Sequence, residues 1–198
     1  MHFVKHMCVN IQPQALIALA FALLLIPLPW IGAWILAALF HECCHMIMIA
    51  MCGGRIKKLE LCAGGARIQT QGLTWGRELL AALAGPAGGL MLVLLQHRYP
   101  RLAVCALCQS LYNLLPLYPL DGGRALRFLL RGSLPPPIAA KTENIAAGVC
   151  FAVLAGCTVY LQIYWKMGIL PMASLIYLGI HRKKLLQTEL SGGTINQI

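Results

Sequence analysis

The chain has 198 residues, of which 59% are hydrophobic and only 11% charged, and its formal net charge is +10. A soluble domain carries about 25% charged residues, so this composition excludes an ordinary water-soluble globular protein and indicates an integral membrane protein. The basic residues lie in short segments between apolar runs, a pattern that sets membrane topology, so we expect no nucleic acid partner.

Six apolar runs follow one another at about 13–30, 33–51, 79–96, 102–118, 144–165 and 168–180. A spanning helix needs about 20 apolar residues, with about 17 as the lower limit, so the last run is the weakest candidate. No Ala-x-Ala-like cleavage site comes promptly after the first run, and we expect a retained helix rather than a signal peptide. The sequence therefore predicts an α-helical integral membrane protein with about six transmembrane helices, forming a single membrane-embedded domain over residues 1–198.

Lysine and arginine are unevenly divided between the segments that join these runs. With six spans, 13 of the 16 lie on one side of the membrane, and the other side holds only Arg98, Arg101 and Lys166. Cytoplasmic segments carry an excess of Lys and Arg, so both termini are predicted to be cytoplasmic. If the last run does not span, the three basic residues after it change sides and the split becomes 10 to 6.

The second run carries the motif Phe40-His41-Glu42-Cys43-Cys44-His45. On an α-helix this His-Glu-x-x-His spacing places two imidazoles one turn apart on one face, suited to a shared metal ion, with a carboxylate beside them. Such side chains are costly at membrane depth and are rarely there without function. The motif predicts a zinc peptidase that works inside a bilayer.

The segment from Arg55 to Thr70, between the second and third predicted helices, is not helix-like. Apolar residues alternate with polar ones on both sides of Gly64-Gly65, which predicts a short β-hairpin. Its role stays open between an ordinary interfacial loop and an edge strand that holds an extended substrate by strand addition.

A catalytic zinc usually takes three protein ligands and leaves one position for water. The other histidines and the other four glutamates lie near the chain ends, in loops or at helix ends, which leaves Asp121 as the third candidate ligand. Two prolines interrupt the fourth run before it, and two glycines after it allow a sharp turn. The second and fourth runs both travel toward the cytoplasm, so their polar groups fall in the same half of the membrane. Alternatively, Asp121 could cap a helix or pair with Arg124.

The two motifs resemble those of the site-2 protease family of intramembrane zinc metalloproteases. The string Asn-x-x-Pro-x-x-Pro-Leu-Asp-Gly-Gly-Arg at 113–124 is especially similar to the branch that contains the stage IV sporulation protease FB. The likeness runs over a core from Ala33 to Arg131. It implies that His41, His45 and Asp121 bind one zinc ion (Zn2+) per chain and that Glu42 is the catalytic acid/base.

The chain also departs from the family pattern. Gly89 stands where many members have Asn, and Cys43-Cys44 replace the commoner Leu-Gly pair inside the metal motif. The chain ends soon after the last run, so we expect no appended nucleotide-sensing (CBS) or peptide-binding (PDZ) domain. Its nine cysteines, including Cys105-x-x-Cys108, are expected to act as small apolar residues rather than as a disulfide framework.

The expected function is regulated intramembrane proteolysis of a membrane-tethered protein, such as a pro-sigma or anti-sigma factor, in a bacterial cell membrane. Glu42 would activate water at the zinc, on the cytoplasmic side. Asn113 would hold the substrate or the oxyanion, or would bond carbonyls freed by the neighbouring prolines. Inhibitory or regulatory membrane proteins are further expected partners. The alternatives are a catalytically silent zinc-binding scaffold or pseudoprotease, and a metal transporter, for which the other runs hold almost no polar groups.

Overall fold

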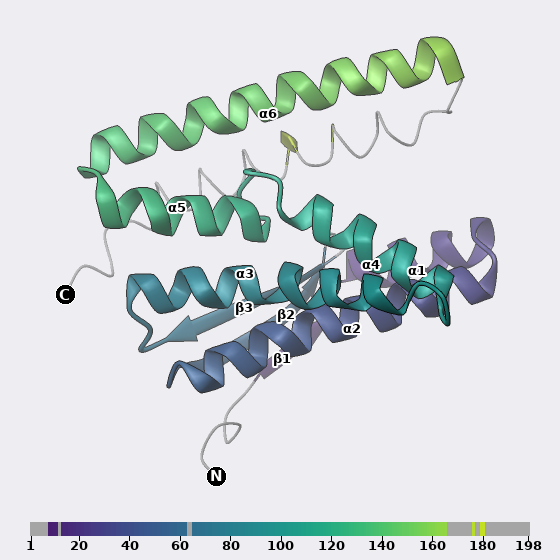
Figure 1. The fold of residues 1–198 in the computed structure, drawn as a ribbon, viewed down its shortest axis with the longest axis horizontal. Helices are drawn as coiled ribbons and strands as arrows, with labels where there is room; N and C mark the ends of the chain where they lie inside the picture. Colours follow the sequence, from purple (N-terminus) through teal and green to yellow (C-terminus); the bar gives the residue numbers. More distant parts are fainter. Residues whose placement is uncertain (1–7, 12, 63–64, 166–175, 177–178, 181–198) are drawn as a thin grey trace. The chain divides into compact units, whose positions relative to one another are not determined.

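The computed structural model describes residues 8–11, 13–62, 65–165, 176 and 179–180, and the chain divides into two compact units after Leu114. The first unit holds three strands and four α-helices (Figure 1): β1 Cys8–Ile11, α1 Pro13–Leu25, α2 Leu28–Met51, β2 Arg55–Cys62, β3 Gly65–Gln71, α3 Trp75–Leu92 with the 3-10 turn η1 Val93–Leu95, and α4 Pro100–Asn113. The second unit holds α5 Asp121–Ser133 and α6 Pro136–Trp165.

Helices α2, α3 and α4 pack against one another to form the centre of the first unit. The buried face of α3 consists largely of alanine and glycine, and the small Ala37 of α2 and Ala106 of α4 are also buried. Small residues let helix backbones approach closely, which is how helices associate where lipid removes the hydrophobic drive. The close packing of α3 against α2 is what shapes the candidate site.

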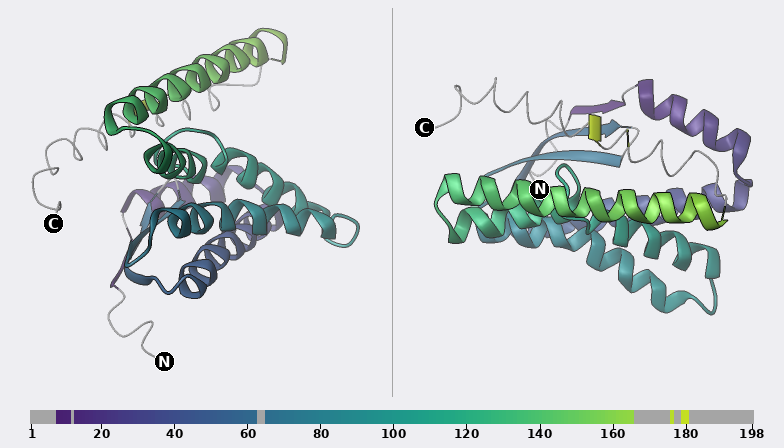
Figure 2. Two further views of the ribbon diagram at one scale, coloured as in Figure 1. Left: turned by 60° about the vertical axis from the view of Figure 1, so that its left-hand side comes forward. Right: turned by 90° about the horizontal axis from the view of Figure 1, so that it is seen from above.

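The predicted hairpin is confirmed, since β2 and β3 pair antiparallel with Leu59 opposite Ile68. The turn residues 63–64 lie outside the described residues. Strand β1 was not predicted; it pairs in parallel with β2, so the sheet order is β1-β2-β3. Buried Ile56 and Ile68 of the sheet cluster with Ile49 of α2 and Ala81 of α3, and the sheet therefore lies against the helices (Figure 2).

In the second unit, α5 and α6 lie side by side and run in opposite directions, as Figures 1 and 2 both show. Helix α5 was not predicted, because its sequence is too polar for an apolar run. Leu117 and Leu120, from the segment before α5, form a buried cluster with Ala147 of α6. This cluster fixes the segment that leads into Asp121.

Three helices of the described part are long and apolar enough to cross a membrane: Leu28–Met51, Trp75–Leu95 and Pro136–Tyr164. The expectation of about six spans is therefore met in part. Helices α1 and α4 have only 13 and 14 residues, below the roughly 17 needed to span. The first run is broken before Pro27, and α4 ends ahead of Pro116, which lacks the N–H that would continue a helix. The run 168–180 lies largely outside the described residues.

Candidate metal centre

The two motif histidines lie one turn apart on the buried face of α2, with exposures of 3% for His41 and 4% for His45. His45 Nδ1 lies 2.6 Å from the backbone oxygen of Ala81 on α3. Because a carbonyl only accepts hydrogen bonds, Nδ1 carries the proton and donates it. In a neutral ring Nε2 then carries the lone pair, and that atom lies 3.1 Å from Nε2 of His41.

This arrangement fits a shared metal ion. Two nitrogens bound to one tetrahedral zinc at about 2.0–2.1 Å would lie roughly 3.3 Å apart, close to the separation of the two Nε2 atoms. Metal-binding histidines also usually donate the other ring N–H to a carbonyl or carboxylate, which fixes the ring and its tautomer. The Ala81 carbonyl supplies that contact for His45.

Gly85 of α3 closes this side of the histidine pair. A Cβ atom at this position would lie 2.6 Å from Cε1 of His45 and 2.7 Å from Nε2 of His41. Both separations are far below van der Waals contact, so a larger residue here would displace the imidazoles. Gly85 is therefore part of the site's wall.

The three residues between the two histidines differ in how exposed their side chains are. Glu42 and Cys44 are half-buried, and Cys43 is exposed. Cys44 packs against Gly88 of α3 through its Sγ atom. Cys105 is buried in the core of the first unit. Seven of the nine cysteines are free thiols: Cys43, Cys44, Cys52, Cys105, Cys108, Cys150 and Cys157.

Asp121 belongs to the second unit, where it is the first residue of α5 and is 8% exposed. The pairing with Arg124 that the sequence left open is present, with Arg124 Nη1 at 3.7 Å from Asp121 Oδ1. Leu120 occupies the N-cap without a side-chain cap bond, and Asp121 follows it as the first residue of the helix. A carboxylate in the first turn is favoured by the helix dipole, so the negative charge of Asp121 is stabilised locally.

Asn113 is the last residue of α4 and is half-buried. Its two expected roles, toward substrate or toward freed carbonyls, stay predictions.

Sequence reasoning missed two buried polar residues of α4 just before Asn113. Gln109 Nε2 donates to the backbone oxygen of Trp34 on α2 at 2.9 Å. Ser110 is completely buried beside Gly89, and its Oγ has no hydrogen-bond partner within the part of the chain that the structure describes. Polar residues at 109, 110 and 113 of an otherwise apolar run were the signal that could have found them.

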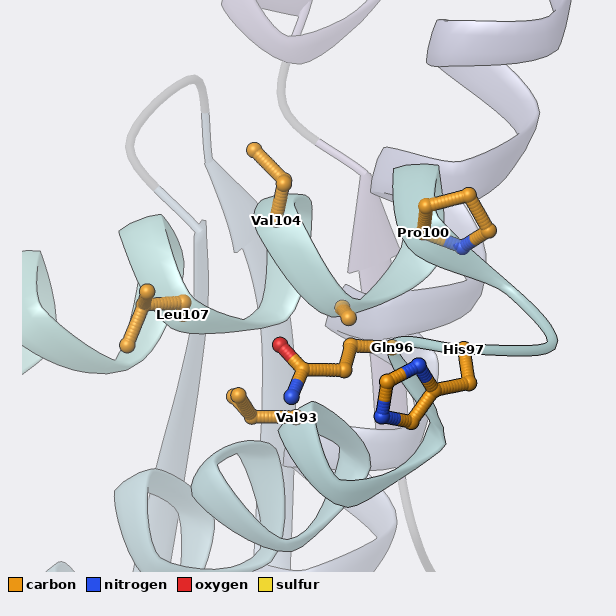
Figure 3. Close-up of a pocket in the computed structure, with 7 residues that line it drawn as sticks. Val93, Gln96, His97, Pro100, Val104 and Leu107 are labelled. Atoms are coloured by element: carbon orange, nitrogen blue, oxygen red, sulfur yellow. The ribbon is translucent and has the colours of Figure 1, made fainter.

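A separate open hollow of about 370 Å³ lies between η1 and α4. Figure 3 shows Gln96 and His97 at its rim, with the apolar side chains of Val93, Val104 and Leu107 around it. None of the motif residues lines it, so it is distinct from the histidine pair.

Comparison with known proteins gives consistent matches. The Peptidase M50B-like family matches residues 14–130. Stage IV sporulation protein FB of Bacillus subtilis (strain 168) is 26% identical over 178 residues, which cover 83% of this chain. The chain spans only 59% of the length of that relative. Among solved structures, the Site-2 Protease from Methanocaldococcus jannaschii matches with a TM-score of 0.65 and 17% identity, covering 93% of each chain, which shows a common fold.

Proposed function

Because the chain belongs to the Peptidase M50B-like family, we propose that it is an intramembrane zinc metalloprotease that hydrolyses peptide bonds in or near the membrane segment of a membrane-tethered protein. The observation that carries this proposal is the buried pair His41 and His45, whose Nε2 atoms face each other at 3.1 Å on a helix apolar enough to span a bilayer. Two imidazoles at membrane depth are too costly to be kept without a use such as metal binding.

His41, His45 and Asp121 together hold one zinc ion in this proposal. All three side chains are buried and offer one nitrogen or oxygen each, which is the ligand set of a catalytic zinc with one position left for water. When bound, zinc lowers the pKa of a water and polarises a substrate carbonyl. The Ala81 carbonyl orients His45, and Arg124 remains near the Asp121 carboxylate.

Glu42 acts as the general acid and base. It follows His41 directly on α2 and is half-buried, as suits a carboxylate that must exchange protons with water. It takes a proton from the attacking water and returns it to the leaving amine. Asn113, at the end of α4, holds the substrate strand or the developing oxyanion.

The proposed topology has six spans, one membrane-embedded domain, and both termini in the cytoplasm with the site toward that side. It rests on the 13 to 3 division of Lys and Arg. Helices as short as α1 and α4 span only where the bilayer thins beside them or where flanking residues reach to the interface. A reporter fused after Ile198 should be found in the cytoplasm, and an external reporter would contradict the arrangement.

The substrate class is proposed from the relative whose name refers to sporulation. A pro-sigma factor or an anti-sigma factor held in the membrane fits a site that opens to the cytoplasm. A helical substrate must unwind locally before cleavage, because the carbonyls of a helix are already hydrogen-bonded. Membrane proteins that inhibit or regulate the protease are proposed as further partners.

The test compares membranes from cells that express the wild type or Glu42→Gln, by sequencing newly formed protein N-termini. Glu42→Gln keeps the proposed ligands, so both proteins should bind zinc. New termini near the cytoplasmic ends of membrane segments, seen only with the wild type, would support the protease and identify its substrates. The same set of termini in both membranes, with zinc bound in both, would contradict it and favour the zinc-binding scaffold.

A further inference from the structure

In the second unit, Arg127 of α5 is buried and paired with Glu143 of α6. Arg127 Nε lies 3.1 Å from both carboxylate oxygens, and Nη2 donates to Glu143 Oε1 at 2.7 Å. The two side chains are only 8% and 12% exposed. Two guanidinium nitrogens therefore bind the carboxylate, which is the strongest and most directional form of an arginine–carboxylate pair.

The same guanidinium also contacts the segment that precedes Asp121. Its central carbon lies 3.9 Å from the centre of the Tyr118 ring, which is cation–π stacking distance. Arg127 thus joins three parts of the second unit: α5, α6 and the 115–120 segment. Tyr118 is three residues before Asp121, so a shift of the ring would move the short stretch of backbone that leads to Asp121.

That stretch of backbone is held closely on its other sides. Leu117 and Leu120 are buried against Ala147 of α6. Gly123, in the first turn of α5, packs directly on the Leu117 carbonyl, where a Cβ atom would lie 2.7 Å from the oxygen. With both ends of the segment held, Arg127 supplies a side-chain contact to the Tyr118 ring that lies between them.

A buried ion pair is weak evidence for stability, because removing both charges from water offsets most of their attraction. A geometric role explains the Arg127 pair better, since Glu143 fixes the plane of the guanidinium and the guanidinium fixes the ring. We propose that Arg127, held by Glu143, is a positioning residue that acts through Tyr118 to aim the Asp121 carboxylate at the metal. This inference rests on the proposed zinc site and adds a supporting shell to it.

The experiment measures zinc affinity on the full-length protein in detergent, with Glu42→Gln as the background so that no proteolysis interferes. Arg127→Lys keeps the positive charge but loses the bidentate, planar contact. Tyr118→Leu removes the ring and leaves the ion pair in place. Each should weaken zinc binding, by at most the roughly 10- to 100-fold that follows the loss of a direct outer partner of a metal ligand. The visible absorption of the Co²⁺-loaded protein should change in shape as the carboxylate moves.

The controls separate positioning from general stability. Arg131 is an exposed residue in the last turn of the same helix, and Arg131→Met should bind zinc as the background does. Tyr118→Phe keeps the ring and should recover most of the affinity lost in Tyr118→Leu. Heat unfolding with the metal removed should place Tyr118→Leu and Tyr118→Phe close together, so that the difference between them lies in the metal site.

Two results would overturn the inference, in different ways. If the background protein binds zinc and both Arg127→Lys and Tyr118→Leu bind it equally tightly with unchanged Co²⁺ absorption, Arg127 does not position Asp121 and the proposed zinc site stands. If the background protein binds no zinc, the proposed function falls and the positioning role falls with it.

Discussion

The histidine pair of the first unit and Asp121 of the second are held by different kinds of contact. His41 and His45 are fixed by close packing, with the Ala81 carbonyl on one ring and Gly85 against both. Asp121 lies at the end of a segment held by an ion pair, an aromatic ring and two leucines. Packing of this kind is sensitive to added volume, whereas the second arrangement is sensitive to the chemistry of its side chains. The two units should therefore respond to different substitutions.

Removing a ligand from either unit is expected to have the largest effect. His45→Ala and Asp121→Ala should each weaken zinc binding by more than about 100-fold, because even outer partners of a ligand are worth roughly 10- to 100-fold. Zinc content after equilibration with a competing chelator measures the loss. Full zinc occupancy in a folded Asp121→Ala protein would contradict the proposal that the second unit contributes a ligand, since the third ligand would then lie elsewhere.

The next effect concerns the apolar anchor of the second unit. Leu117 is completely buried against α6, so Leu117→Ala should lower the free energy of unfolding by about 2–5 kcal/mol. Leu129→Ala, on the exposed face of α5, is the matched control and should change it little. Denaturant unfolding in mild detergent measures both. Equal losses in the two variants would mean that the segment before Asp121 is not anchored through Leu117.

A methyl group added at Gly85 tests the close packing of the first unit. Gly85→Ala should lower the free energy of unfolding by about 1–3 kcal/mol, because the methyl group meets both imidazoles. It should also weaken zinc binding. Gly76→Ala on the same helix has open space around it and should be neutral or slightly stabilising. If the two variants bind zinc equally, α3 does not form the wall of the histidine site.

The smallest expected effect is at Ser110. Replacing it with alanine removes a buried hydroxyl that lacks a partner among the described residues, so the melting temperature should stay the same or rise, by the equivalent of about 1 kcal/mol. Loss of proteolysis without loss of stability would show instead that the hydroxyl takes part in the reaction. The first unit would then contribute a chemical role at Ser110 in addition to its close packing.

The sequence predicted the parts of the fold that depend on local pattern. The motif on α2 and the alternation around Gly64-Gly65 both produced the expected element, a helix with two histidines on one face and a hairpin. Apolar runs do not reveal helix α5, because its pattern is amphipathic. Strand β1 was missed because four residues pair in parallel with a strand far along the chain, which no local pattern reveals.

The contacts that hold the candidate site residues in place were not predicted from the sequence. From the sequence, Arg127 was only one of the positive charges that predict membrane topology, and Glu143 was only an acidic residue near a helix end. Their pairing depends on α5 and α6 folding back on each other, a tertiary arrangement that the sequence alone does not give. Likewise, nothing in the local sequence marks the Ala81 carbonyl as the partner of His45.

The parallel pairing of β1 with β2 sets an order of assembly during synthesis. Both α1 and α2 lie between the two strands in the chain, so β1 leaves the ribosome well before its partner exists. The two helices are therefore synthesised before the strand that completes the β1–β2 pair, and β1 has no β2 partner until Cys62 has been made. A chain truncated after Met51 should leave Cys8–Ile11 open to protease, and a chain extended past Cys62 should bring protection.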